Sequence, residues 1–145
     1  MACRLRAAIF SSMTHALPPQ ITGWFTSRGW SLHPHQQAML ARAGTPCQLL
    51  IAPTGGGKTM AGFLPSFAEL ARRKQQGLHT LYVSPLKALA TDIKRNLIGP
   101  VTEMGLPIRI EDRTGDTSSH IKRRQRADPP HILLTTPESL ALLLS

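Results

Sequence analysis

The chain is 145 residues long, with 41% hydrophobic residues and a formal net charge of +9. This length allows one domain with a substantial core, and the apolar fraction excludes a disordered chain. The basic balance favours a polyanionic partner such as nucleic acid, although a basic protein without that role is the alternative. No apolar run approaches the roughly 18 residues that a membrane span requires, so we expect no membrane partner and a cytoplasmic location.

Cysteine and histidine usage gives no metal site. Cys3 and Cys47 do not have metal-ligand spacing, and such a distant pair favours reduced thiols. His33 and His35 lack further ligands nearby in the sequence, so we expect a structural or solvent-exposed pair. Residues 1–17 carry arginines, no acid and too short an apolar stretch for a signal peptide. We interpret them as a leader that is disordered or that reflects a misassigned start.

Two short helices are predicted ahead of the first strand. The first follows the prolines at 18–19 and ends at Gly29, and the second begins at Pro34 and ends at Gly44. Gln36 lies in the second helix. A glutamine amide can pair bidentately with an adenine edge, and an aromatic from the preceding helix could cover the base. A surface glutamine without that role is the alternative.

The rest of the chain is organised around residues 49–59. The apolar run at 49–52 predicts a buried strand, and three glycines, Lys58 and Thr59 follow it. This is the phosphate-binding pattern G-x-x-x-x-G-K-[ST], with Ala52 in place of the first glycine. Glycines let backbone N–H groups curl around phosphate oxygens, and the helix beginning near Lys58 adds its positive end.

We therefore expect ATP and Mg²⁺ as cofactors. Lys58 would reach the β- and γ-phosphates, and the Thr59 hydroxyl would bind Mg²⁺. The alternative is a glycine-rich strand-to-helix turn with an incidental lysine. The expected nucleotide-binding residues of the loop are Thr54, Gly55, Gly56, Gly57, Lys58 and Thr59.

Three more strands are predicted, at 80–84, 107–111 and 131–135, each followed by a helical pattern. Strands that alternate with helices in this way predict an α/β fold with a parallel sheet. Pro65 interrupts the helix after the glycine loop, which predicts a kink or a shortened helix.

Helix starts follow each of these strands. Ser84 and Thr136 each precede a proline, and Thr114 opens a Thr-Gly-Asp-Thr turn. Serine or threonine before proline favours a helix start, and all these starts lie at the carboxyl edge of the sheet, where open α/β folds bind ligands. Their N–H groups suit nucleic-acid phosphates, although helix capping alone explains the same residues.

Five ordered motifs, between about Trp24 and Ser145, resemble those of superfamily 2 helicases. The motif sequences are most similar to those of the Lhr (large helicase-related) group and its DNA-ligase-associated DEXH-box branch. In that family alanine normally replaces the first glycine of motif I. The matches are residues 34–36 with the Q motif, 52–59 with motif I, 85–90 with motif Ia, and 114–117 and 136–139 with later single-strand-contacting motifs.

The resemblance implies a partial RecA-like P-loop NTPase domain at 18–145, with helices on both faces of a parallel sheet. It implies an ATP-dependent helicase or translocase that acts on DNA in repair, with single-stranded DNA, or alternatively RNA, as partner. It gives Gln36 the adenine role. The implied nucleic-acid contacts are Ser84, Pro85, Lys87, Arg113, Thr114, Gly115, Asp116, Thr136, Pro137 and Glu138.

The sequence departs from the family after these motifs. Motif II, motif III and the second domain with its arginine fingers have no counterpart, so we expect an N-terminal piece whose missing domains act in cis. Glu111 and Asp112 are one alternative for the Mg²⁺-binding carboxylates, but Arg109 interrupts their apolar run. Without those groups we expect no turnover. The alternatives are a non-catalytic module with residual nucleotide and nucleic-acid binding and, more distantly, another P-loop enzyme such as a kinase.

Overall fold

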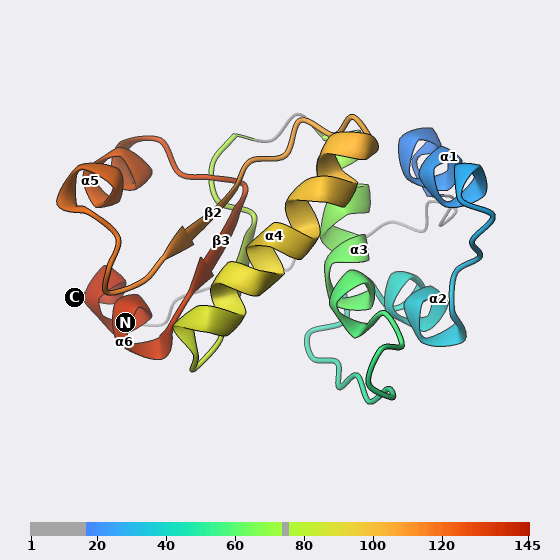
Figure 1. Ribbon diagram of the computed structural model, residues 1–145, viewed down its shortest axis with the longest axis horizontal. Helices are drawn as coiled ribbons and strands as arrows, with labels where there is room; N and C mark the ends of the chain where they lie inside the picture. Colours follow the sequence, from blue (N-terminus) through green and yellow to red (C-terminus); the bar gives the residue numbers. More distant parts are fainter. Residues whose placement is uncertain (1–16, 74–75) are drawn as a thin grey trace.

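A computed structural model describes residues 17–73 and 76–145, and Figure 1 shows their arrangement. The predicted leader, except Leu17, and Cys3 lie outside the described residues. Among the described helices, none is long and apolar enough to cross a membrane. The elements are α1 (Pro19–Ser27), α2 (Pro34–Ala41), α3 (Lys58–Arg72), β1 (Thr80–Val83), α4 (Lys87–Glu103), β2 (Ile110–Arg113), α5 (Ser119–Ala127), β3 (Ile132–Thr135) and α6 (Pro137–Leu144).

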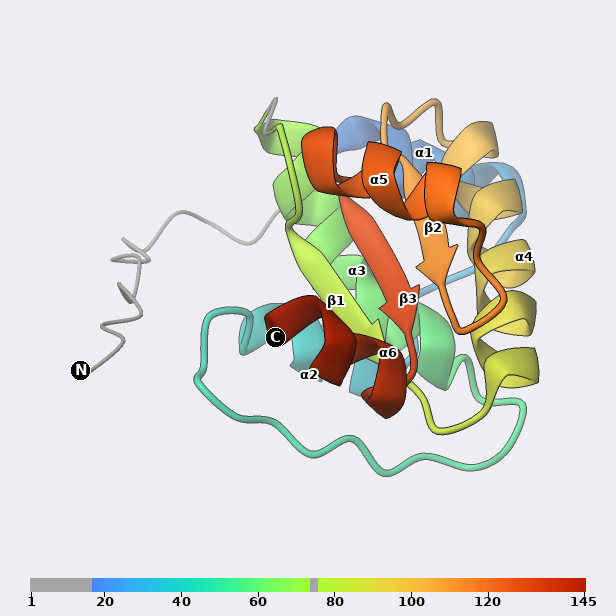
Figure 2. The same cartoon turned by 90° about the vertical axis from the view of Figure 1, so that its left-hand side faces the viewer.

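The three strands form one parallel sheet in the order β1-β3-β2. The central strand β3 is buried along its whole length, as expected for an apolar strand with neighbours on both sides. Its Thr135 is in register with Val83 of β1 and Arg113 of β2, so the three carboxyl ends lie in one row. Figures 1 and 2 show α3 and α4 on one side of the sheet and α5 on the other. The α/β class, the parallel sheet and the helices on both faces are therefore confirmed.

The predicted strand at 49–52 is wrong. These residues pair with no other strand of the described chain, and Leu49 and Ile51 are 86% and 83% exposed. A strand is defined by ladder hydrogen bonds to a neighbour, which an apolar run cannot supply by itself. The described sheet consequently ends at β1, where Leu81 and Val83 are also exposed.

The remaining strands fall close to their predicted positions. β1 and β3 agree to within one residue at each end, whereas β2 starts at Ile110 instead of residue 107. Pro107 has no N–H to donate to a ladder, and the Arg109 N–H donates to the His131 Nδ1 at 2.9 Å instead of to a strand carbonyl. The ladder therefore begins later than the β-branched pattern suggested.

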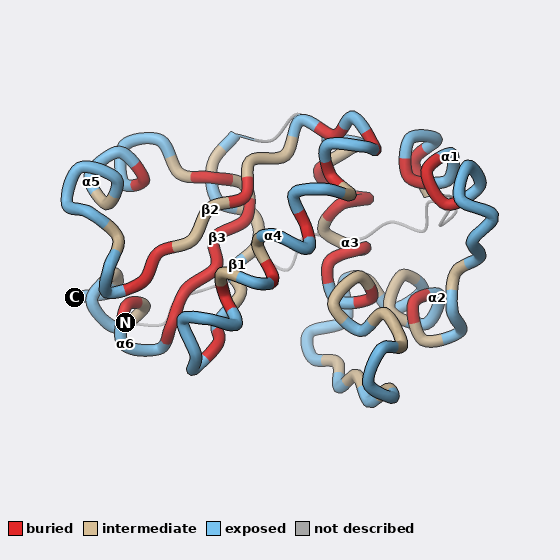
Figure 3. The backbone as a smooth tube through the Cα atoms, viewed as in Figure 1, coloured by how far each residue is buried: buried red, intermediate tan, exposed pale blue. Residues whose placement is uncertain are grey.

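Helix α3 continues through Pro65 for 15 residues, so the predicted shortening is wrong. Proline removes one hydrogen bond from a helix interior, but here both sides of it pack into the core. Leu64 and Phe67 are fully buried against the sheet side, and Phe63 stacks on Phe67 with ring centroids 6.2 Å apart. Figure 3 shows buried positions on α3, on α4 and along the central strand β3. Packing thus maintains a helix that local propensity would break.

The proline rule for helix starts holds at Pro19, Pro34 and Pro137 but fails at Pro85. Pro137 is the first residue of α6, and the Thr136 hydroxyl accepts a hydrogen bond from the Ser139 N–H at 3.4 Å. Helix α4 instead begins at Lys87, two residues after Pro85, and α3 begins at Lys58, well after Pro53. The chain therefore makes short turns after β1 and before α3.

Candidate functional site

The loop before α3 has a backbone conformation that requires glycine at several positions. Gly55 and Gly57 have φ angles of +79° and +71°, in the left-handed region that other residues rarely adopt. A Cβ added at Gly56 would lie 3.1 Å from the Pro53 carbonyl oxygen, and one added at Gly57 would lie 2.8 Å from Gln36 Nε2. The loop is thus closely wrapped, as a backbone cradle for phosphate oxygens requires.

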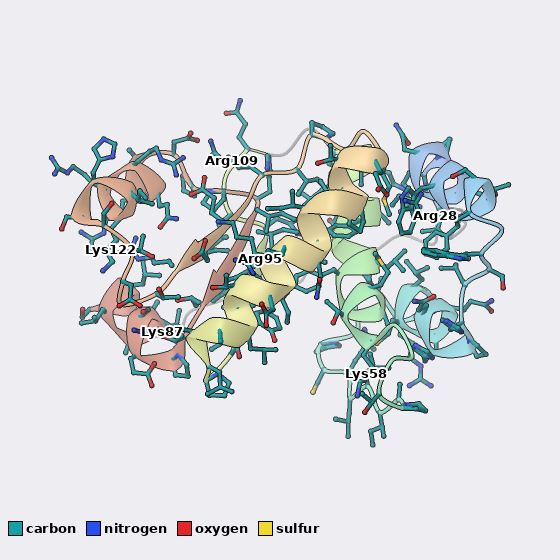
Figure 4. All side chains as sticks on the ribbon, viewed as in Figure 1. Arg28, Lys58, Lys87, Arg95, Arg109 and Lys122 are labelled. Carbon is teal, nitrogen blue, oxygen red and sulfur yellow. The ribbon has the colours of Figure 1, made fainter. Side chains whose placement is uncertain are left out.

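Lys58 and Thr59 are the first two residues of α3. No side chain caps this helix, so the N–H groups of its first turn remain available to a ligand. Within the described residues the exposed Lys58 ammonium has no hydrogen-bond or ion-pair partner. Figure 4 shows Lys58 at the glycine-loop end of α3. A loop of glycines, a free helix N-terminus and an unpaired cation suit the charge of a triphosphate, so these residues fit ATP.

A hollow of about 330 Å³ adjoins this helix start. It lies between the first turns of α3, strand β1 and Ile93 of α4. None of the described residues that line it is acidic. Its lining consists of Lys58, Thr59, Gly62, Phe63, Thr80, Leu81, Tyr82 and Ile93.

Gln36 lies directly against the glycine loop. It is 4% exposed, its Oε1 accepts from the His33 N–H at 2.9 Å, and its Nε2 donates to the Gly57 carbonyl at 3.4 Å. The amide therefore closes the start of α2 and joins that helix to the loop. Its expected contact with adenine requires that these internal bonds be exchanged or shared.

The aromatic side chains of α1 occupy the core instead of the nucleotide site. Trp24 and Phe25 are each 8% exposed, and the Trp24 Nε1 donates to Glu103 of α4 at 2.7 Å. Arg28 stacks over the Trp24 ring at 4.6 Å and pairs with Glu103 as well. Trp24 thus attaches α1 to α4, both aromatic side chains belong to the core, and aromatic cover for the base stays a prediction.

Two histidines behind the loop were missed as neighbours of the nucleotide site. The His33 and His35 rings stack in parallel with centroids 5.4 Å apart, and a Cβ at Gly57 or Gly56 would approach them to 3.7 and 3.9 Å. No group of three potential metal ligands exists among the described residues. Their position next to Gln36 in the sequence could have predicted that they lie near the nucleotide site.

The predicted nucleic-acid residues that end the strands are mainly structural. Ser84, Thr114 and Thr136 are at most 6% exposed. The Ser84 N–H donates to the Thr135 carbonyl at 2.9 Å, and the Thr135 hydroxyl donates to the Arg113 carbonyl at 2.7 Å. These bonds fix the carboxyl edge, and the helix starts beyond it remain exposed.

The predicted contacts that are exposed at this edge are Pro85, Lys87, Gly115, Asp116, Pro137 and Glu138. The Lys87 Nζ lies 3.0 Å from both carboxylate oxygens of Asp116. The backbone N–H of Glu138, the Thr136 hydroxyl and the charge of Lys87 lower the pKa of the Glu138 carboxyl. Sequence motifs from three separate segments therefore do meet at one edge.

Arg113 is placed differently from the prediction. Its side chain is 5% exposed and donates to the Lys122 carbonyl at 3.2 Å, so it holds α5 against the end of β2 instead of facing a ligand. Burial, together with the nearby charge of Arg126, lowers the pKa of the Arg113 guanidinium. Lys122 itself reaches the exposed edge, where its Nζ donates to the Gly115 carbonyl at 3.2 Å. Lys122 was not among the predicted nucleic-acid contacts.

Glu111 and Asp112 do not form a disguised Mg²⁺ site. They lie on β2, at the sheet edge opposite β1 and the hollow beside Lys58. Arg124 binds both Glu111 oxygens at 3.0 and 2.7 Å, and Asp112 pairs with Lys94 at 2.5 Å. Hydrogen bonds from Arg124 and Gln125 outweigh the effect of partial burial and lower the pKa of Glu111. Both carboxylates anchor helices to β2.

A parallel α/β sheet with a glycine-lined phosphate loop at a helix start defines a P-loop nucleotide-binding protein. Residues 33–145 match the family model of DEAD/DEAH box helicases, so the chain belongs to that family. It is 45% identical over 136 residues to the Lhr helicase/probable uracil glycosylase of Mycolicibacterium smegmatis, covering 84% of this chain and 9% of the relative. It is 41% identical over 145 residues to the ATP-dependent helicase Lhr-Core protein 2 of Thermococcus barophilus, covering 89% and 17%.

Solved structures agree with this assignment. The Mycobacterium smegmatis helicase Lhr bound to ssDNA and AMP-PNP matches with a TM-score of 0.78 and 42% identity, covering 88% of this chain and 18% of that one. The DUF1998 helicase MrfA matches with a TM-score of 0.79 and 30% identity, covering 91% and 21%. The resemblance to the Lhr group and the RecA-like helicase fold are confirmed, and the DNA-ligase-associated branch stays a prediction. The chain spans less than a quarter of the length of each of these relatives.

Proposed function

We propose that this chain is the ATP-binding N-terminal part of an ATP-dependent helicase or translocase that acts on single-stranded DNA in repair. The observation that carries the proposal is the glycine loop, because its left-handed Gly55 and Gly57 lead directly into the uncapped start of α3 at Lys58. This arrangement presents N–H groups and an ammonium to one point, which is the requirement for binding a triphosphate.

In the proposed complex each loop residue has a separate task. The N–H groups of residues 54–57 bind phosphate oxygens, Lys58 neutralises the β- and γ-phosphates, and Thr59 offers its hydroxyl to Mg²⁺. Gln36 contacts the adenine edge from its place against Gly57. Bound Mg²⁺ supplies charge neutralisation at the β- and γ-phosphates.

The nucleic acid is proposed to lie across the carboxyl edge of the sheet. The exposed groups there are Lys87, the Gly115 turn and the start of α6 at Pro137, which follow the aligned ends of the three strands. Contacts of this kind go to phosphates and fix register without reading bases. DNA is favoured over RNA because the related Lhr structure contains ssDNA.

The nucleotide part is tested by titrating Mg–ATP into wild type, Lys58→Ala and a matched control, Arg95→Ala, in a calorimeter. Arg95 is an exposed cation on α4 with no partner among the described residues, and Figure 4 shows it apart from Lys58. We expect the Lys58 variant to lose ATP binding and the Arg95 variant to retain it. Equal affinity of all three proteins would contradict the assignment of Lys58.

A specific observation also favours the alternative of a binding module without turnover. The described lining of the hollow beside Lys58 and Thr59 holds no carboxylate, and Glu111 and Asp112 are engaged elsewhere. We propose that hydrolysis in the parent protein depends on carboxylates and arginines supplied by further domains in cis. Phosphate release from this chain alone is therefore expected to be absent.

A further inference from the structure

Two lysines from different helices reach the same exposed turn at residues 114–117. Lys87 begins α4, and its Nζ would lie 3.6 Å from a Cβ added to Gly115. Lys122, one turn into α5, donates from its Nζ to the Gly115 carbonyl at 3.2 Å. Figure 4 shows both lysines at the side of the sheet that carries α5 and α6. The turn therefore has an ammonium group on either side of its glycine.

One of these two ammonium groups, that of Lys87, is already paired with a carboxylate of the same chain. Asp116 accepts from Lys87 with both oxygens at 3.0 Å, and Glu138 is close enough for the Lys87 charge to act on it. A carboxylate and a phosphodiester offer a lysine the same kind of acceptor, and both carry negative charge. The sequence resemblance implied that Asp116 contacts nucleic acid, yet an ionised carboxylate repels phosphate instead of binding it.

The ion pair between Lys87 and Asp116 is exposed and can be exchanged for another partner. Lys87 and Asp116 have 54% and 80% of their side chains exposed, and exposed ion pairs contribute little to stability. The other lysine–aspartate pair of α4 joins Lys94 to Asp112 of β2. Its side chains are only 32% and 28% exposed, and it holds α4 to β2. The chain thus combines one structural pair with one exchangeable pair.

We propose that Lys87, Lys122 and the Gly115 turn form a preformed seat for one nucleic-acid phosphate, and that Asp116 is a built-in competitor which the phosphate displaces from Lys87. This inference rests on the proposed nucleic-acid path. It adds Lys122 to that path and changes the role of Asp116 from a contact to an opposing group. Asp116 keeps Lys87 oriented while the seat is empty and limits affinity when a strand binds, which suits a protein that must release DNA as it moves.

The test measures binding of a fluorescently labelled oligothymidylate to the full chain by anisotropy, at low salt and at physiological salt. Asp116→Asn removes the competitor and should tighten binding by about twofold to fivefold, the range that corresponds to a weak exposed ion pair. The matched control is Asp92→Asn, which removes the same charge from an exposed position of α4 that has no described partner. Its effect should be smaller, because Asp92 pairs with neither Lys87 nor Lys122.

A second matched pair tests Lys122. Lys122→Gln should weaken binding clearly more than Arg123→Gln, although both remove one charge from neighbouring positions of α5, and Lys122→Arg should retain affinity. Unchanged thermal unfolding midpoints would establish that the variants are folded. Weaker or unchanged binding by Asp116→Asn would overturn the competitor role, and equal effects of the two α5 glutamine variants would overturn the seat. Lys87→Gln reports separately on the proposed path, which fails if that variant binds like wild type.

Discussion

Replacing Gly57 by alanine tests how the nucleotide loop is held. Gly57 has a φ of +71°, and a left-handed conformation costs an L-residue about 1–2 kcal/mol. The new Cβ would also lie 2.8 Å from Gln36 Nε2, so this atom must move and its bond to the Gly57 carbonyl would be lost. A lost hydrogen bond of this kind costs about 0.5–1.5 kcal/mol. The more restricted unfolded chain returns about 0.4–1 kcal/mol, which leaves a net destabilisation of about 0.5–3 kcal/mol.

Urea unfolding followed by circular dichroism measures this change, and Mg–ATP titration reports on the loop itself. The control is Gly23→Ala in α1, where an added Cβ meets nothing within 4 Å. Alanine in a helix interior is more stable than glycine by about 0.5–1 kcal/mol, so this variant should gain stability and retain ATP binding. The Gly57→Ala variant should be less stable than wild type and should lose ATP binding.

The role of Gln36 can be separated by a double mutant. Once Gln36→Ala has removed the amide, Gly57→Ala should cost only the backbone strain of about 1–2 kcal/mol, less the gain in the unfolded state. The two substitutions should therefore be less damaging together than the sum of the single effects. Strict additivity, or a Gly57 variant as stable as wild type, would refute the packing of Gln36 against the loop.

Two further predictions concern the packing of the core and the stability of the protein at acidic pH. Phe67→Ala should cost about 3–5 kcal/mol in urea unfolding because the side chain is fully buried, whereas Leu86→Ala at a 63% exposed position should stay within about 0.5 kcal/mol; similar losses in both would contradict the assigned core. Because the pKa of Glu111 is lowered in the folded state, its ionised form stabilises the protein above pH 4.5, the ordinary pKa of a glutamate. This stabilisation is lost as the pH falls through the lowered pKa. Glu111→Gln should therefore flatten the dependence of the unfolding free energy on pH below about pH 4.5. An unchanged acid slope would show that Arg124 does not stabilise the ionised form.

Local patterns predicted the elements whose causes are local. The glycine loop, the start of α3 at Lys58 and the threonine cap of α6 all follow from residue types and spacing. β3 was also predictable, because four consecutive buried residues suit a strand covered on both faces. The order in which the strands pair was not predictable from such patterns.

Features that depend on distant partners were missed for physical reasons. The run at 49–52 has strand composition but no partner strand among the described residues, so it stays exposed. Arg113 has the chemistry of a phosphate contact, yet the carbonyl of Lys122 captures it. Trp24 has the chemistry of a base-stacking residue, yet Glu103 holds it in the core. In each case the deciding group lies elsewhere in the chain, where spacing rules give no information.

We propose that this chain binds ATP through residues 54–59 and does not hydrolyse it by itself. One purified preparation should be assayed for Mg–ATP binding by calorimetry and for phosphate release, with Lys58→Ala measured beside it. We expect wild type to bind ATP, the variant not to bind, and phosphate release to be indistinguishable between the two. Release that is present in wild type and absent in the variant would contradict the account, and so would equal ATP binding by both proteins.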